Sequence, residues 1–176
     1  DYIGSRDAKR ILVGLPKKVI SRRSDLINAI RDLRNVHDIT WYGAARGRNR
    51  WKGCDGAIAI GRNQAPPEAL EDMANALTWE DPDVTIKRLP VSEDGHRNLE
   101  SKKRYRRMRG GVPSYANTMV HPDGLCQKLL EQMREAETIQ FIDRIRPHDY
   151  IGSSPKKKIW IMGSTPVDVT VDKVVD

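Results

Sequence analysis

The fold is decided by a short apolar run near the start of the sequence, Arg10-Ile11-Leu12-Val13-Gly14-Leu15. Continuous apolar runs of this length are typical of parallel strands that are buried on both faces. A helix is predicted next, because apolar residues recur at helical spacing from Leu26 to Leu33, with Ser21 or Ser24 as its cap. The pattern therefore begins as a strand followed by a helix.

Two further strands and a second helix extend this pattern. Asp38 to Tyr42 predicts one strand, and Ala57 to Ile60 predicts another, whose apolar residues on both sides place it at the centre of a sheet. Pro66-Pro67 then opens a helix from Glu68 to about Leu77, since proline is tolerated in a first helical turn. This order predicts an α/β fold with a largely parallel sheet and helices on both of its faces.

The middle of the chain interrupts the α/β pattern. Val84 to Leu89 is compatible with a strand, and residues 104–109 with 114–120 predict a basic β-hairpin. We interpret residues 82–120 as an inserted β arm, so that residues 1–176 form a single domain. After the arm, the sequence predicts a helix from about Gly124 to Ile145, which ends before Pro147, and a last strand at Lys158 to Met162.

Composition excludes several classes of protein. The chain has no apolar run near the roughly 20 residues of a membrane-spanning helix, so no membrane partner is expected. Its two cysteines are far apart in the sequence, which argues against a disulfide framework or a cysteine-rich zinc site. We expect a cytoplasmic protein. The sequence begins at Asp1 without an initiator methionine, as in a processed product or a piece of a longer chain.

The charge balance favours a polyanionic partner, although a surplus that serves solubility is the simpler alternative. Lysine and arginine total 31 residues against 24 acidic residues, which gives a net charge of +7 and an isoelectric point near 9.5. Seven of the cations fall between Arg97 and Arg109 with one acid, Glu100. We call residues 97–109 the basic segment. Its charge is local and is therefore a better sign of binding than a diffuse surplus.

Three groups of residues are candidates for binding. The first is a glycine- and arginine-rich stretch from Gly43 to Gly53, called here the basic loop, which begins with Ala44-Ala45-Arg46-Gly47-Arg48-Asn49. Glycines allow close backbone approach and the arginines supply positive charge, which suits a phosphate or nucleic acid. An ordinary basic loop between two strands is the alternative.

The second group lies at a helix end, Gln140-Phe141-Ile142-Asp143-Arg144-Ile145-Arg146. An arginine that reaches a γ-phosphate stabilises charge in phosphoryl transfer, and its planar fork suits that role. Arg144 and Arg146 point in different directions on a regular helix, so they share one task only if the helix is ending. A salt-bridged helix terminus, with cations near the negative end of the dipole, is the alternative.

The third group is the basic segment itself, which surrounds Tyr105 with Arg104, Arg106 and Arg107. Cations beside an aromatic ring suit a strand that follows a single-stranded backbone and stacks one base. Charged edge strands also prevent aggregation, which gives a structural alternative.

The sequence contains no complete set of catalytic motifs. There is no GxxxxGK[ST] phosphate loop, no GxSxG elbow and no pair of histidines at helical spacing, so no metal site is predicted. Cys54 has no base close to it in the sequence. The chain is therefore not expected to act as an enzyme by itself.

Taken in order, these segments resemble the second RecA-like domain of superfamily-two helicases. The fifth motif of that family typically reads A-A-R-G-x-D before a strand, and the stretch 44–49 is similar. The sixth reads Q-x-x-G-R-x-x-R, and the stretch 140–146 is similar. The chain also looks like the C-terminal part of phage- and plasmid-type replication helicases, whose GxNxW/F-xxxD pattern matches Gly47, Asn49, Trp51 and Asp55. The resemblance covers most of residues 10–176 through short motifs.

The sequence departs from these motifs at three positions. Asn49 replaces the usual aspartate, Asp143 replaces the glycine of the sixth motif, and the second arginine comes one residue early. Arg144 is therefore the first candidate for an arginine finger, and Arg146 the second.

The resemblance implies the C-terminal motor domain of a nucleic-acid-dependent ATPase. A first RecA-like domain, absent from this chain, would hold most of the ATP and Mg²⁺. The residues implied at the nucleotide are Gly47, Asn49 and Gln140, together with the catalytic Arg144 and Arg146. Nucleic acid, with DNA favoured over RNA, would meet Arg46, Arg48, Arg104, Tyr105, Arg106 and Arg107.

Two other functions stay open. One is a non-enzymatic basic nucleic-acid-binding module of a phage or mobile element, which would bind through the arm regardless of nucleotide. The other is an interaction domain of a replication or packaging assembly whose cations are merely solvated. Dependence on nucleotide separates the motor domain from the module, and neutralisation of the arm separates the module from the interaction domain.

Overall fold

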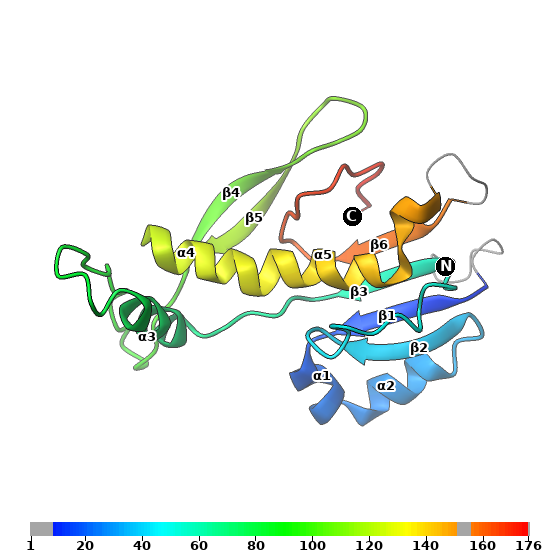
Figure 1. Cartoon of the computed structure of the whole chain (residues 1–176), viewed down its shortest axis with the longest axis horizontal. Coiled ribbons are helices and arrows are strands. Elements are labelled where there is room, and N and C mark those ends of the chain that lie inside the picture. The colour runs from blue at the N-terminus through cyan, green and yellow to red at the C-terminus, as the bar shows by residue number, and fades with distance from the viewer. Residues whose placement is uncertain (1–8, 151–155, 176) are drawn as a thin grey trace. The chain divides into compact units, whose positions relative to one another are not determined.

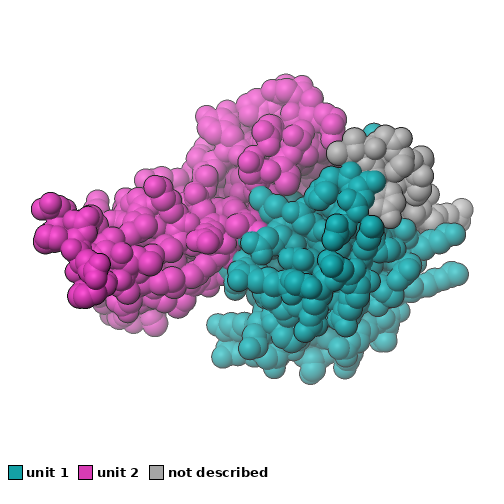
Figure 2. Space-filling view, viewed as in Figure 1, with its two compact units in different colours: residues 1–63, 137–163 teal, residues 64–136, 164–176 magenta. Residues whose placement is uncertain are grey.

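The computed structural model describes residues 9–150 and 156–175, and their contacts divide into two compact units. Unit 1 contains the described residues of Asp1–Asn63 and Glu137–Gly163, and unit 2 contains those of Gln64–Ala136 and Ser164–Asp176 (Figure 2). The grouping of residues 1–176 in a single domain stays a prediction.

Unit 1 is built on a parallel sheet of four strands in the order β2-β1-β3-β6 (Figure 1). The strands are β1 (Ile11–Leu15), β2 (Val36–Trp41), β3 (Gly56–Ile60) and β6 (Lys158–Met162), and each neighbouring pair is parallel. This confirms the predicted α/β class and the parallel sheet. β3 lies between β1 and β6, as its apolar residues on both faces predicted.

Helices cover both faces of this sheet, because successive side chains of a strand point to opposite sides. Ile11, Val13 and Leu15 pack into one buried cluster with Ile27 of α2 (Ser24–Arg31). Leu12 packs into a second cluster with Phe141 of α5 (Glu137–Ile142). The continuous apolar run that begins the fold is therefore buried from both sides.

The helix predicted around Leu26 to Leu33 is confirmed as α2, which ends at Arg31, and an unpredicted helix, α1 (Lys17–Arg22), precedes it. The two helices are separated at Arg23, whose backbone leaves the helical region with φ −129° and ψ 61°. Neither helix has a side-chain cap, so the predicted serine caps are wrong. Ser21 instead donates its hydroxyl to the Lys18 carbonyl inside α1, and Ser24 begins α2.

Unit 2 joins an antiparallel hairpin to two helices. The hairpin consists of β4 (Glu100–Arg106) and β5 (Ser114–Val120). β4 begins and ends earlier than predicted, so residues 107–109 lie outside it, and the inserted basic arm stays a prediction. α3 (Pro67–Leu77) begins at its predicted proline, and α4 (Gly124–Glu131) is capped by Asp123, which accepts the backbone N–H groups of Leu125 and Cys126.

The predicted strand at Val84 to Leu89 is wrong. The segment has no regular secondary structure, because side chains bind its backbone: Leu89 N–H donates to Glu71 at 2.7 Å and Lys87 N–H donates to Asp123 at 2.9 Å. Ile86 and Leu89 are buried in a cluster with Leu70 of α3, whereas Val84 is exposed. Apolar residues were therefore not sufficient to predict a strand in this segment.

The long helix predicted from Gly124 to Ile145 is a series of four short elements. α4 is followed by a π-helical turn (Gln132–Ala136), then α5, then a 3₁₀ turn (Asp143–Ile145). Arg146 adopts the left-handed conformation with φ 49°, and a further 3₁₀ turn (Pro147–Tyr150) follows. The helix thus ends before Pro147, as predicted. No helix of the described residues is long and apolar enough to cross a membrane.

Candidate functional site

The basic loop of unit 1 is fixed to the core by a tryptophan. Trp51 is fully buried, and its indole N–H donates to Asp38 Oδ2 of β2 at 2.6 Å. Arg50 contacts the same oxygen at 2.8 Å and lies over the Trp51 ring, 4.7 Å from its centroid. Ala45 and Cys54 are buried in the same cluster. The loop therefore holds a defined shape despite its glycine and arginine content.

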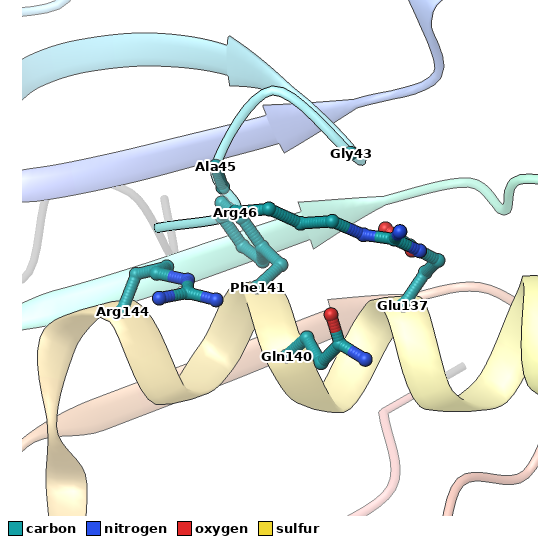
Figure 3. A pocket seen from close by; sticks show the side chains of 7 residues that line it. All are labelled: Gly43, Ala45, Arg46, Glu137, Gln140, Phe141 and Arg144. Atoms are coloured by element: carbon teal, nitrogen blue, oxygen red, sulfur yellow. The ribbon is translucent and has the colours of Figure 1, made fainter. Parts of the chain in front are cut away.

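A small hollow lies between this loop and the helix that carries the sixth-motif resemblance (Figure 3). Gly43, Ala45 and Arg46 line it from the loop, and Phe141 and residues 137, 140 and 144 line it from the helix. The empty space amounts to about 150 Å³, including the part that opens to solvent. The structure thus brings Arg46, Gln140 and Arg144, three of the predicted site residues, to one place.

Close packing of α5 on β1 shapes this hollow. A Cβ atom at Gly14 would lie 2.5 Å from the Phe141 ring, so the helix approaches this closely only because residue 14 is glycine. Tyr42 meets the same ring edge-on with centroids 5.7 Å apart, and its hydroxyl donates to the Ile60 carbonyl at 3.1 Å. Burial raises the pKa of Tyr42, which keeps its hydroxyl protonated as a donor.

Arg46 crosses the hollow and forms an ion pair with Glu137 (Figure 3). The side chain of Arg46 is 64% exposed, whereas that of Glu137 is 4% exposed. A buried carboxylate without a partner is costly, so the pair holds the loop and α5 together. Glu137 was missed from the sequence, although its spacing of three and seven residues from Gln140 and Arg144 places all of them on one helix face.

Arg144 is the unsatisfied group of the hollow. Its Nε is buried and has no hydrogen-bond partner among the described residues. No carboxylate in the described part of the chain lies within ion-pair distance of Arg144 either. The predicted alternative of a salt-bridged helix end therefore does not describe Arg144. A buried donor without an acceptor is uncommon in proteins and points to a missing partner at this position.

The remaining candidates of unit 1 lie near the end of the same helix. Arg146 donates to Asn49 Oδ1 at 3.4 Å, so the second arginine and the loop asparagine are brought together. Gly47 has φ +70°, a conformation that favours glycine. The adjacent Arg48 is exposed, and its side chain has no polar partner among the described residues. Lys157 further joins the loop to the helix end by donating to the carbonyls of Lys52, at 2.6 Å, and Ile145.

In unit 2, most cations of the basic segment already have partners. Arg104 contacts Glu131 at 2.8 Å and Glu135 at 3.4 Å. Arg107 contacts Asp168 at 2.8 Å. Arg106 donates to the carbonyls of Tyr115 and Ser164 at 3.3 and 3.5 Å. The acids come from distant segments, so the local sequence overstated the free positive charge of this segment.

Tyr105 and the arginines beside it do not form one surface. Residues alternate along β4, so Tyr105 points to the face opposite Arg104 and Arg106. Tyr105 is 64% exposed, and its ring lies 4.5 Å from that of Tyr115, its direct partner across the hairpin. Tyr115 was not singled out in the sequence, because the pairing register that unites the two rings is not visible there.

Cys54 lacks the properties of a reactive cysteine, because burial raises the pKa of its thiol and removes it from solvent. Within residues 9–150 and 156–175, no three or more His, Cys, Asp or Glu side chains are grouped so as to hold a metal ion.

Comparison of the chain with protein-family models, with curated proteins and with solved structures finds no match. The helicase resemblance is therefore tested by none of these comparisons, and it remains a prediction.

Proposed function

We propose that the chain is the second RecA-like domain of a nucleic-acid-dependent ATPase of the helicase type, with Arg144 as its arginine finger. The observation that carries the proposal is the state of Arg144: its Nε is buried without an acceptor, and no acid of the described residues pairs with it. An anionic oxygen is the acceptor that best fits a guanidinium donor. A γ-phosphate supplies such oxygens and is the group transferred in ATP hydrolysis.

The hollow does not enclose a ligand by itself, because its empty space of about 150 Å³ includes the part that opens to solvent. In this proposal another domain therefore binds the nucleotide, and this chain contacts only one end of it. In this proposal that domain also holds Mg²⁺, while Gln140 and Arg144 of this chain face the phosphate.

The basic loop supplies a link between nucleotide and nucleic acid in this proposal. Arg46 is bound to Glu137 at the hollow, yet its side chain is 64% exposed, and Arg48 is exposed on the same loop. Backbone phosphates would meet these two arginines and the exposed Gly47 between them. A shift of α5 at the nucleotide would then move the loop through the Arg46–Glu137 ion pair. Such a movement would couple ATP hydrolysis to the affinity for nucleic acid.

The basic nucleic-acid-binding module is the second candidate. The exposed ring pair of Tyr105 and Tyr115 favours it, since neither ring is needed in the core. The ion pairs of the basic segment weaken it, because paired cations release fewer counterions on binding. This candidate predicts binding that is indifferent to nucleotide.

The test compares ATP turnover of the native polypeptide with that of its Arg144→Ala and Arg144→Lys variants, in the presence of single-stranded DNA. Because arginine fingers contribute about 10³-fold or more to kcat, we expect both variants to lose at least that factor. Binding to DNA should be unchanged.

Arg31→Ala is the matched control, since Arg31 is an exposed arginine of α2, on the opposite face of the sheet. The control should hydrolyse ATP like the wild type. Turnover that is unchanged in Arg144→Ala would contradict the arginine-finger assignment.

A further inference from the structure

One face of the β4–β5 hairpin carries exposed aromatic rings that the core does not use. Tyr105 and Tyr115 are directly opposite each other in the register, with exposed fractions of 64% and 49%. Their ring centroids are 4.5 Å apart and the ring planes are tilted by 50°. The other face of β5 is buried through Ala116, Thr118 and Val120. The hairpin is thus packed on one side and open on the side of the rings.

The same open face holds a cation without a carboxylate partner. Lys103 precedes Tyr105 by two residues, so it points to the same side, and its Nζ lies 5.5 Å from the centroid of the Tyr115 ring. Among the described residues, no acid lies within ion-pair distance of Lys103. Its cross-strand neighbour is the exposed Asn117. A free ammonium group therefore stands beside two accessible aromatic faces.

This combination matches the chemistry of unpaired nucleotides. Bases stack on aromatic side chains whatever their identity, and a lysine beside the stack neutralises the backbone phosphate. Double-stranded nucleic acid has its bases stacked on one another and offers only its terminal faces to such rings. A protein partner would be expected to add apolar contacts, but the pair next to the rings on this face, Lys103 and Asn117, is polar; the apolar Met119 lies one pair further along.

We propose that Tyr105, Tyr115 and Lys103 form a stacking site for unpaired bases of single-stranded nucleic acid. The proposal rests on the nucleic-acid part of the proposed function and is independent of ATP. It changes the residues assigned to the arm, because Arg104 and Arg106 point to the other face of the hairpin. The ligand is recognised by its exposed bases, with the phosphates contributing charge.

The experiment uses two fluorescent probes of equal length and charge, a 15-nucleotide thymidine strand and an abasic strand of the same backbone. Affinity of the whole chain for each is measured by fluorescence anisotropy at low salt. The wild type should bind the thymidine strand more tightly. The double variant Tyr105→Ala/Tyr115→Ala should lose about 5- to 100-fold of that affinity and bind the two probes equally.

Two control variants separate stacking from structure. Tyr105→Phe/Tyr115→Phe keeps both rings and should retain the preference for bases. Trp79→Ala removes another exposed ring of unit 2, which is 78% exposed, and should bind like the wild type. Circular dichroism establishes that the double alanine variant is folded. For a second readout, a strand containing 5-iodouracil should crosslink to Tyr105 or Tyr115 of the wild type.

Several results would overturn the proposal. Equal binding of both probes by the wild type would exclude base recognition, and crosslinks confined to other residues would place the bases elsewhere. A change of oligomeric state in the double alanine variant, with unchanged affinity for thymidine, would show that the rings contact a second copy of the chain. Each of these results leaves the Arg144 assignment untouched, whereas unchanged ATP turnover in Arg144→Ala leaves the stacking site untouched.

Discussion

The basic loop of unit 1 and the basic segment of unit 2 look alike in the sequence, but their cations have different partners. In the loop, Arg46 pairs with Glu137, a carboxylate that is only 4% exposed. In the segment, Arg107 and Arg109 pair with Asp168 and Asp172, which are 87% and 74% exposed. The segment has one buried ion pair at its start, between Arg97 and Glu71, which is 1% exposed, but the ion pairs of Arg107 and Arg109 near its end lie at the surface.

This difference shows that local positive charge is a poor measure of available charge. The basic segment has seven cations and one acid within residues 97–109, yet five of these cations contact carboxylates: Arg97, Lys102, Arg104, Arg107 and Arg109. Arg144, outside both stretches, has a buried Nε without an acceptor among the described residues. Whether a cation is available to bind a ligand depends on its burial and its ion-pair partners, and neither can be obtained from the amino-acid composition.

The largest expected effect comes from removing the anchor of the basic loop. Trp51→Ala should lower the free energy of unfolding by about 3–5 kcal/mol, because it empties a fully buried site and leaves Asp38 without the indole donor. Urea unfolding followed by circular dichroism measures this loss. Trp79→Ala, at an exposed tryptophan of unit 2, should change stability by no more than about 0.5 kcal/mol. Equal changes in the free energy of unfolding for the two substitutions would contradict the conclusion that Trp51 anchors the loop in the core.

An intermediate effect is expected from the ion pair at the hollow. Arg46→Ala leaves the buried Glu137 without its partner and should cost about 1–3 kcal/mol of unfolding free energy, toward the lower end because Arg46 is largely exposed. Arg46→Lys should recover part of this loss. Urea unfolding provides the measurement. If Arg46→Ala were as stable as the wild type, Glu137 would not depend on Arg46.

The smallest effect is expected in the basic segment. Arg107→Ala removes an ion pair in which both side chains are largely exposed, so the free energy of unfolding should fall by about 0–1 kcal/mol. The same unfolding experiment, repeated at high salt, should bring the variant and the wild type closer together. A loss as large as that of Arg46→Ala would remove the distinction between the two regions.

Much of the sheet was predictable from the sequence because buried parallel strands are continuous apolar runs. β1, β3 and β6 lie where such runs occur. The segment Val84 to Leu89 has apolar residues separated by polar ones, and it forms no strand, since Glu71 and Asp123 bind its backbone. Contacts between residues far apart in the chain therefore decided that this segment forms no strand, and such contacts cannot be predicted from a local sequence pattern.

The candidate site was predictable only in part. The helix end that carries Gln140 and Arg144 was found through its motif-like pattern, and the structure places both residues at the hollow. Glu137 was missed, although its helical spacing from them was a usable signal. Tyr115 had no such signal, because its pairing with Tyr105 depends on the hairpin register. Spacing within one element is readable from a sequence, whereas register between elements is not.

The central claim is that Arg144 completes a nucleotide site that another domain holds. The most direct measurement is the intact mass and full sequence of the native polypeptide, obtained by immunoblot and mass spectrometry from its source cells. We expect a product several hundred residues longer than this chain, with a phosphate loop on the amino-terminal side. A native product near 20 kDa that binds no partner carrying such a loop would contradict the claim.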